Sequence, residues 1–174
     1  MCFFLYEVVW LVKQSLNIVG LIRMQVAQSR IKKEMVEMRA RDGTDNFQLN
    51  MVEDDMFHWD ATLFGPPDTP YANGIFHLDI RIPDGYPFCP PKVRFVTRIF
   101  HCNVSPSGGI CIDILKDEWS PALTMCKVIM SISSLLSECN PDDPLNIDVA
   151  QLYRRDKQAH DLRAQEWTRI YAYG

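Results

Sequence analysis

Apolar and polar residues alternate strictly in four successive short segments of this chain, which restricts the folds that it can adopt. Neighbouring side chains of a strand point to opposite faces, so each segment is predicted to be a strand with one buried face. The apolar members are, in order, Phe47, Leu49 and Met51; Phe57, Trp59, Ala61 and Leu63; Phe76, Leu78, Ile80 and Ile82; and Val93 and Phe95. Turn-forming residues at 54–55, 65–68 and 83–85 separate the segments, which indicates an antiparallel meander.

A helix is predicted before the sheet. Ile31, Met35 and Met38 have helical spacing and form its apolar face. The charged residues between them are predicted to form a solvent-facing edge that is basic near its start: Arg30, Lys32, Lys33, Glu34 and Glu37. Turn-forming residues at 42–45 are predicted to end this helix.

A long loop and three helices are predicted after the sheet. The sheet is expected to end near Thr97, and a long loop is expected between that point and the next helix. So long a loop inside a small domain is usually functional. A helical stripe able to lie across the sheet then follows: Met125, Val128, Ile129, Ile132, Leu135 and Leu136. A turn at 141–144 precedes two helices near Leu145–Tyr153 and Asp156–Tyr171. The predicted fold class is therefore α+β: helix, four-stranded antiparallel meander, long loop, three helices.

The composition excludes several classes of function. The chain has 174 residues, enough for one domain with a substantial core. Its net charge of −4 and the lack of a basic stripe argue against nucleic acid as a partner. The six cysteines and four histidines show no zinc-ligand spacing, so no metal and no cofactor are predicted. Reduced thiols, and hence a cytoplasmic or nuclear location, are expected.

Residues 1–23 are treated as an extension whose role the sequence leaves open, with 24–174 as the folded core. The extension is apolar, but Glu7 and Lys13 argue against a membrane span, because each would cost about 2–3 kcal/mol in a bilayer. It also lacks the positive start of a signal peptide. Two interpretations remain: an interfacial or partner-binding helix, or a working start at Met24.

One loop concentrates the polar and reactive residues. His101 and Asn103 precede Cys111, the pair Gly108–Gly109 allows a sharp turn, and Asp113 follows. With the flanking segments 86–91, 119–124 and 140–144, this loop resembles the core of a ubiquitin-conjugating enzyme, over roughly residues 29–173. The resemblance implies the fold of that family and places its thioester-forming cysteine at Cys111.

The resemblance suggests roles for the other loop residues. The amide of Asn103 could donate to the oxyanion formed when lysine attacks the thioester, a contribution of about 3 kcal/mol, or it could brace the loop backbone. His101 is expected to be structural. Asp113 and Asp143 would surround the incoming lysine, or act as solvated turn residues. Cys102 stands where the family usually has proline, as in members with a His-Cys-Asn motif, and this leaves the rigidity of the loop in question.

The resemblance also implies partner surfaces. Exposed phenylalanine and proline in short loops would contact RING-type ligases and, in part, the activating enzyme; HECT-type ligases are a second class of partner. The residues matched to this surface are Arg30, Pro87, Phe88, Ser120, Pro121 and Ala122. Cys89 replaces a lysine common in the family. Met130 and Ser134 match positions that contact the carried ubiquitin, although Met130 could equally lie in the core.

The predicted function is ATP-dependent ubiquitin conjugation. Ubiquitin would pass from the activating enzyme to Cys111 as a thioester, and then to a lysine of a protein substrate. Two alternatives are an inactive ubiquitin-handling scaffold of the same fold and a cysteine hydrolase that uses Cys111 with His101. The presence of both Cys111 and Asn103 argues against the scaffold, and the lack of an orienting partner for His101 argues against the hydrolase.

Overall fold

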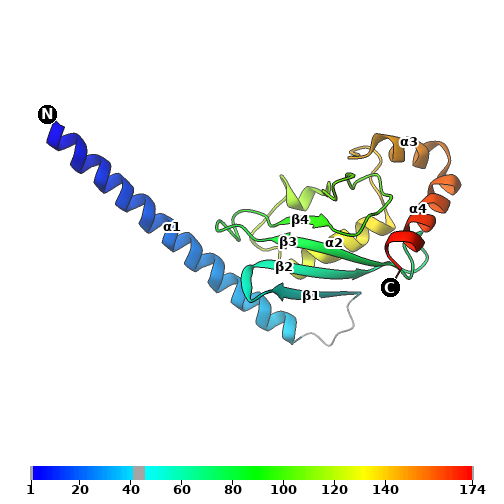
Figure 1. The fold of residues 1–174 in the computed structure, drawn as a ribbon, viewed down its shortest axis with the longest axis horizontal. Helices are drawn as coiled ribbons and strands as arrows, with labels where there is room; N and C mark the ends of the chain where they lie inside the picture. The colour runs from blue at the N-terminus through cyan, green and yellow to red at the C-terminus, as the bar shows by residue number, and fades with distance from the viewer. Residues whose placement is uncertain (1, 41–45, 174) are drawn as a thin grey trace.

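Four antiparallel strands in chain order form the centre of the structure, a computed structural model (Figure 1). It describes the backbone of residues 2–40 and 46–173, and side chains from Ile18 onward outside that gap. The elements are α1 (Cys2–Arg39), β1 (Phe47–Val52), β2 (Asp55–Phe64), β3 (Ile75–Arg81), β4 (Lys92–Phe95), a 3-10 turn η1 (Asp113–Leu115), α2 (Met125–Ser137), α3 (Ile147–Arg155) and α4 (Lys157–Tyr171). The predicted α+β layout is confirmed.

The predicted alternation matches the register of the sheet. Trp59 of β2 lies opposite Met51 of β1 and Ile80 of β3, and Leu78 lies opposite Phe95 of β4. Apolar residues of β2 and β3 are therefore brought onto one face. The first hairpin turns one residue earlier than predicted, because Glu53 and Asp54 both have positive φ and Asp55 already belongs to β2.

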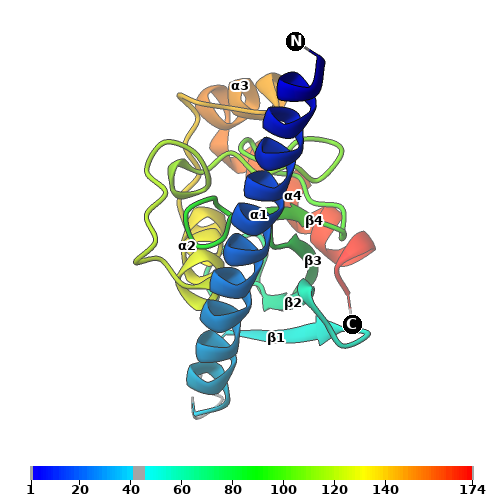
Figure 2. The ribbon, with the colours of Figure 1, turned by 90° about the vertical axis from the view of Figure 1, so that its left-hand side faces the viewer.

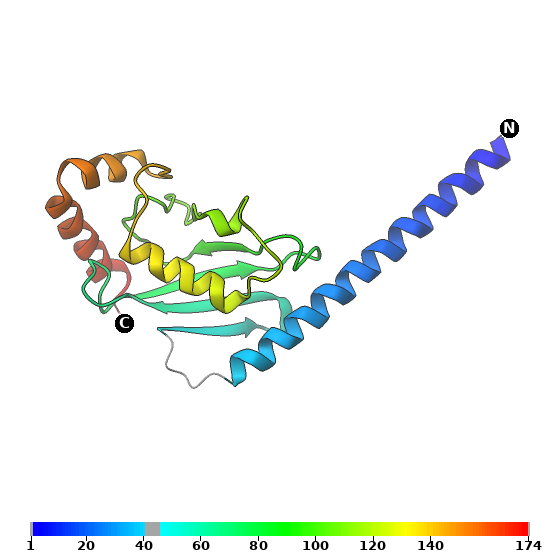
Figure 3. The same cartoon turned by 180° about the vertical axis from the view of Figure 1, so that it is seen from behind.

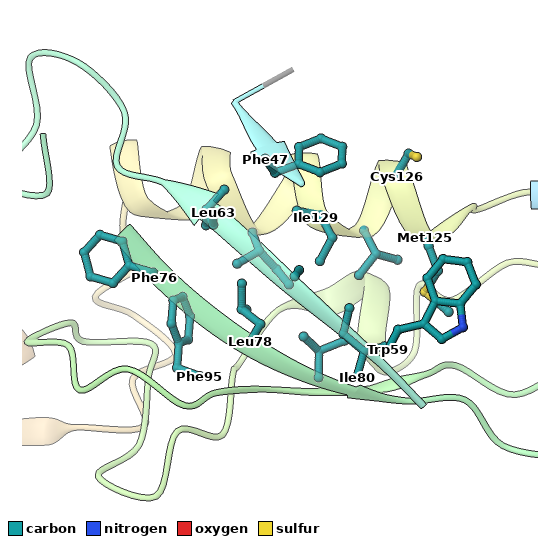
Figure 4. Packing of buried hydrophobic residues seen from close by; sticks show 14 of the residues in the cluster. Phe47, Trp59, Leu63, Phe76, Leu78, Ile80, Phe95, Met125, Cys126 and Ile129 are labelled. Carbon is teal, nitrogen blue, oxygen red and sulfur yellow. The ribbon is translucent and has the colours of Figure 1, made fainter. Parts of the chain in front are cut away.

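The α2 helix covers the apolar face of the sheet (Figure 3). Val128, Ile129 and Ile132 are fully buried against it, and Figure 4 shows Met125 and Ile129 facing side chains of β2 and β3. Each such buried side chain contributes roughly 1.5–3 kcal/mol through the hydrophobic effect. Thr124 caps α2 by accepting a hydrogen bond from the Lys127 amide, so the helix begins where the long loop ends.

The α1 helix is longer than the predicted first helix. Its 38 residues run unbroken through Met24, and its N-terminal half projects away from the sheet (Figures 1 and 2). Residues 18–26 are exposed, and Ala27 is the first buried side chain among the described residues. The predicted helix-ending turn at 42–45 lies outside the described residues. Among the described helices, none combines the length and apolarity that crossing a bilayer requires.

The prediction that Glu34 faces solvent is wrong. Only 3% of this residue is exposed, and its carboxylate accepts hydrogen bonds from the Tyr86 hydroxyl at 2.5 Å and the Met125 amide at 2.8 Å. Arg30 donates to the same carboxylate from one turn earlier, at 2.5 Å. Glu34 therefore joins α1 to the 83–89 loop and to the start of α2, and its charge is balanced by Arg30.

The last two helices lie at the end of the sheet far from the projecting part of α1 (Figure 1). Asn146 caps α3 and Asp156 caps α4 through their side chains. The amide of Ile75 donates to the carbonyl of Ala172, which holds the end of α4 against the start of β3. The 138–146 segment between α2 and α3 lies beside the long loop, because its amides at 145 and 146 donate to a carbonyl of that loop.

Candidate active site

The loop from Val96 to Thr124 is fixed to the edge of the sheet by Gly108. This glycine has a φ of +88°, and a Cβ there would lie 2.0 Å from the carbonyl oxygen of Phe95. The Phe95 amide donates to the Gly108 carbonyl at 2.9 Å. Only glycine combines this backbone conformation with so close an approach. The sharp turn expected before Cys111 is therefore present, and Gly108 supplies it.

Cys111 contacts two charged side chains, which also contact each other. Its Sγ donates a hydrogen bond to Oδ2 of Asp143 at 2.9 Å, and Nζ of Lys116 donates to Sγ at 2.8 Å. Lys116 and Asp143 also form an ion pair at 3.5 Å. Only 5% of Cys111 is exposed, whereas the side chains of Lys116 and Asp143 are 48% and 61% exposed. The two charged groups thus cover a thiol at the surface of the domain.

Asp143 and Lys116 have opposite effects on the pKa of the Cys111 thiol. Burial raises the pKa of the Cys111 thiol, and so does the hydrogen bond to Asp143, whereas the ammonium of Lys116 lowers it; the net result is a raised pKa. The hydrogen bond from Cys111 and the charge of Lys116 hold the pKa of the Asp143 carboxyl below its usual value. The resting sulfur is thus a protonated thiol with a cation in contact.

Asn103 joins the long loop to the 140–143 segment. Its side-chain NH2 donates to the carbonyl oxygens of Asn140 and Asp143 at 2.7 and 2.9 Å. Its Oδ1 accepts from the amide of Asn140 at 2.8 Å, and its own carbonyl accepts from the amide of Cys111 at 2.9 Å. Asn103 therefore positions both Asp143 and Cys111, as the bracing interpretation expects, and the oxyanion role stays a prediction.

His101 is buried behind the loop. Its Nε2 lies 3.0 Å from the carbonyl oxygen of Leu135 on α2, and its Nδ1 accepts from the amide of Asn103 at 3.0 Å. Burial lowers the pKa of His101 to about 4, because a charged imidazole would lose its hydration there. With both ring nitrogens engaged and 1% of the residue exposed, His101 braces the loop and is not placed to act on Cys111.

Cys102 is directed away from the surface. It is completely buried, packs with Val149 and Ala150 of α3, and donates from Sγ to Oδ1 of Asn103 at 3.1 Å. The adjacent Cys139 thiol, together with burial, raises the pKa of Cys102. The amides of Leu145 and Asn146 both donate to the Cys102 carbonyl at 2.9 Å. Packing and hydrogen bonds therefore fix the loop at Cys102 without a proline ring.

Comparison with protein families agrees with this geometry. Residues 30–168 match the family model described as "Ubiquitin-conjugating enzyme". The chain belongs to the ubiquitin-conjugating enzyme family. The matched segment starts at Arg30, three residues after the first buried side chain in the described part of α1, and contains the sheet, the long loop and Cys111. Family membership supports a transferase of ubiquitin conjugation, with ubiquitin, an activating enzyme and ligases as the general partners.

The surface matched to ligases in this ubiquitin-conjugating enzyme is only partly exposed. Phe88 is 71% exposed, and Ser120, Pro121 and Ala122 are exposed in the adjacent loop. Pro87, expected to be an exposed proline, is buried, and its carbonyl accepts a hydrogen bond from the Trp119 indole at 2.8 Å. Pro87 therefore supports the surface from below, since the Trp119 contact ties the two loops together.

Arg30 stabilises the same surface from α1. Its guanidinium donates to the carbonyl oxygens of Pro121 and Leu123 at 2.7 and 2.8 Å, and it also lies over the ring of Tyr86. The side chain is 22% exposed. Arg30 therefore fixes the position of the 120–123 loop and presents only its edge to a partner.

The residues matched to the carried ubiquitin lie on the outer face of α2. Met130 is 46% exposed and Ser134 is exposed, and positions four residues apart share one side of a helix. Met130 is thus a surface residue, which answers the question of whether it belongs to the core. Asp113, the remaining acidic candidate, is exposed on η1, and its carbonyl accepts from the amides of Lys116 and Glu118.

Lys116 is the residue of this site that sequence reasoning missed. The 3-10 turn over 113–115 reverses the chain after Cys111 and returns the Lys116 side chain to the sulfur. The spacing of five residues gave no helical or strand periodicity from which to predict this contact. Among the described residues, no group of acidic residues, cysteines and histidines has a metal-binding arrangement.

Proposed function

We propose that this ubiquitin-conjugating enzyme carries ubiquitin as a thioester on Cys111 and passes it to a lysine of a protein substrate together with a RING-type ligase. The observation that carries the proposal is the position of the Cys111 sulfur, 2.8 Å from the Lys116 ammonium and braced through Asn103. We also propose a cytoplasmic or nuclear location, because a reducing compartment suits the thiols of Cys89, Cys102, Cys111 and Cys139, which form no disulfide.

Thioester exchange does not need a strong base at the cysteine. One thioester is converted into another, so the step requires access and a fraction of thiolate, and not an activated water. The arrangement of His101 favours this chemistry over hydrolysis, because an imidazole with both nitrogens engaged cannot activate water beside the thioester. The hydrolase alternative therefore lacks its general base.

Transfer to lysine requires the incoming amine to lose a proton. Asp143 has an exposed carboxylate in contact with Cys111, so it can accept a hydrogen bond from an amine that approaches the thioester carbonyl. Asp113 offers a second exposed carboxylate on η1. Carboxylates orient the amine but raise its pKa, so the loss of its proton has to be favoured by desolvation during transfer.

The test of the proposal is thioester formation on Cys111. Incubation with ubiquitin, ATP and activating enzyme should give a thiol-sensitive adduct, which Cys111→Ala abolishes and Cys111→Ser converts into an ester that resists mild reductant. Cys102→Ala is the matched control and should load, because Cys102 is completely buried. An adduct that survives Cys111→Ala would overturn the assignment, and failure to load at all would favour the inactive scaffold.

The ligase surface is tested by Phe88→Ala. Phe88 is 71% exposed, so the substitution should leave the melting temperature and ligase-free discharge unchanged and reduce discharge stimulated by a RING-type ligase at least tenfold. Val36→Ala is the matched control, because Val36 on α1 is 66% exposed and lies outside the surface. Equal stimulation of the two variants would contradict the proposed surface.

A further inference from the structure

The proposed function uses the contact between Lys116 and Cys111 to locate the site but assigns it no chemical role. Its ammonium donates to the Cys111 sulfur at 2.8 Å, nearer than its distance of 3.5 Å to the Asp143 carboxylate. The 3-10 turn fixes this position, since the Lys116 amide donates to the Asp113 carbonyl at 2.9 Å. A cation that contacts a sulfur stabilises the thiolate over the thiol.

The same sulfur carries charge in both half-reactions. During loading, the Cys111 thiol gives its proton to water and the thiolate forms a bond to the ubiquitin carbonyl carbon. The bond from that carbon to the cysteine of the activating enzyme breaks, and that cysteine leaves as a thiolate. During discharge, the lysine nitrogen bonds to that carbon, the carbon–sulfur bond breaks and its electron pair returns to Cys111, while the proton of the amine passes to a carboxylate or water. The sulfur is thus a nucleophile in one step and a leaving group in the other.

We propose that Lys116 is a catalytic residue of this enzyme, whose ammonium stabilises the Cys111 sulfur as an anion both when it attacks and when it leaves. The proposal rests on the proposed function, in which Cys111 carries the thioester. Asp143 contacts the same sulfur beside Lys116 and opposes the effect of the lysine on its charge. The pair therefore sets a balance: the lysine favours the thiolate, and the carboxylate favours the thiol.

Other charged groups near this site have different contacts. Asp142, adjacent to Asp143, pairs with Arg154 of α3, and Asp113 is exposed on η1. His101 is neutral and buried behind the loop. Lys116 lowers the pKa of the Cys111 thiol, while burial and Asp143 raise it. These are the directions expected for a cation and an anion in contact with the sulfur. Among the described residues, the charged side chains that contact Sγ are therefore Lys116 and Asp143.

The decisive measurement is the alkylation of Cys111 in the full chain by iodoacetamide, an uncharged probe, as a function of pH. The modified Cys111 peptide is quantified by mass spectrometry, because exposed Cys89 also reacts. Lys116→Met should shift the midpoint upward by about one pH unit. The rate near neutral pH should fall only about threefold, because a more basic thiolate is also a better nucleophile.

Three companion variants separate this role from a loss of fold. Lys116→Arg keeps the cation and should restore the wild-type profile, and Asp143→Asn should shift the midpoint downward. Lys92→Met removes an equally positive, exposed side chain from β4 and should change nothing. The shift in Lys116→Met should shrink from low salt to about 1 M salt, because the ammonium is half exposed and therefore screened.

Rates of loading and discharge complete the test. Both should fall in Lys116→Met, by a similar factor of at least three, while the melting temperature stays unchanged. Superimposable alkylation profiles for Lys116→Met and Lys92→Met, or no recovery in Lys116→Arg, would overturn the proposal. A chain that never loads ubiquitin but shows the expected alkylation shifts would disprove the proposed function alone, so the two failures are distinguishable.

Discussion

Asn103 and Asp143 are joined by a hydrogen bond of 2.9 Å, from the side-chain amide of one to the main-chain carbonyl of the other. Through this contact the long loop determines where the Asp143 carboxylate meets the Cys111 sulfur. Both hydrogens of the amide are engaged by carbonyl oxygens, the second by that of Asn140. An oxyanion at Cys111 could use this amide only if one of these bonds were exchanged.

The first prediction concerns Asn103→Ser. The hydroxyl is too short to replace the amide, so the partly buried carbonyls and the Asn140 amide lose their partners, and the free energy of unfolding should fall by about 2–3 kcal/mol. Loading and discharge should fall together. Asn146→Ser is the control, because serine replaces asparagine well at the α3 cap. Unchanged stability with normal loading and roughly hundredfold slower discharge would instead identify Asn103 as the oxyanion donor.

The second prediction concerns the buried carboxylate of Glu34. Glu34→Ala should lower the free energy of unfolding by about 3–5 kcal/mol, because it leaves the Arg30 charge without its partner and removes the acceptor of the Tyr86 hydroxyl. Urea unfolding measures this loss. Glu37→Ala, which removes an exposed carboxylate one turn away on α1, should cost less than about 1 kcal/mol. Equal effects of the two substitutions would contradict the structural role of Glu34.

Glu34 also shows how far sequence periodicity can be used. The alternation in β2 and β3 predicted which side chains face the core, because each strand face is set by local period alone. The side of α1 on which Glu34 lies was predicted wrongly, because its partner Tyr86 is distant in sequence. A charged residue is assigned to solvent unless a partner is known, and periodicity cannot supply that partner.

Part of the candidate site could likewise be predicted from the sequence, and part of it could not. Cys111 was predicted from its loop and motif, whereas its contacts with Lys116 and Asp143 depend on the turn at 113–115 and on Asn103. Those contacts join segments with no common period. The family resemblance placed Asp143 near Cys111, but only the fold could show the contact with Lys116. Pro87 was misplaced for a related reason, since the Trp119 indole that covers its carbonyl comes from another loop.

The third prediction is a dependence of stability on pH caused by His101. Its pKa is about 4 in the folded protein and about 6.5 when unfolded, so its stabilising contribution is complete above pH 6.5 and is lost as the pH falls through 4. From pH 7 to pH 5 the loss should be about 2 kcal/mol. The free energy of unfolding of His101→Gln, measured with urea at each pH, should lack this part of the pH dependence. That of His77→Gln, at an exposed strand position, should keep it. Parallel curves for all three proteins would refute the assignment.

The last prediction concerns residues 1–23. A chain that begins at Met24 should keep its melting temperature and its single-turnover discharge, because the first buried side chain of the described part of α1 is Ala27. Ile18, Leu21 and Ile22 are at least half exposed, so their removal should improve solubility and cost little core burial. A chain that begins at Lys32 is the contrasting control. It loses Ala27, Arg30 and Ile31, and should melt well below the full chain. A marked loss of stability or discharge in the chain that begins at Met24 would show that the extension packs on the core, and the boundary at residue 24 would then be wrong.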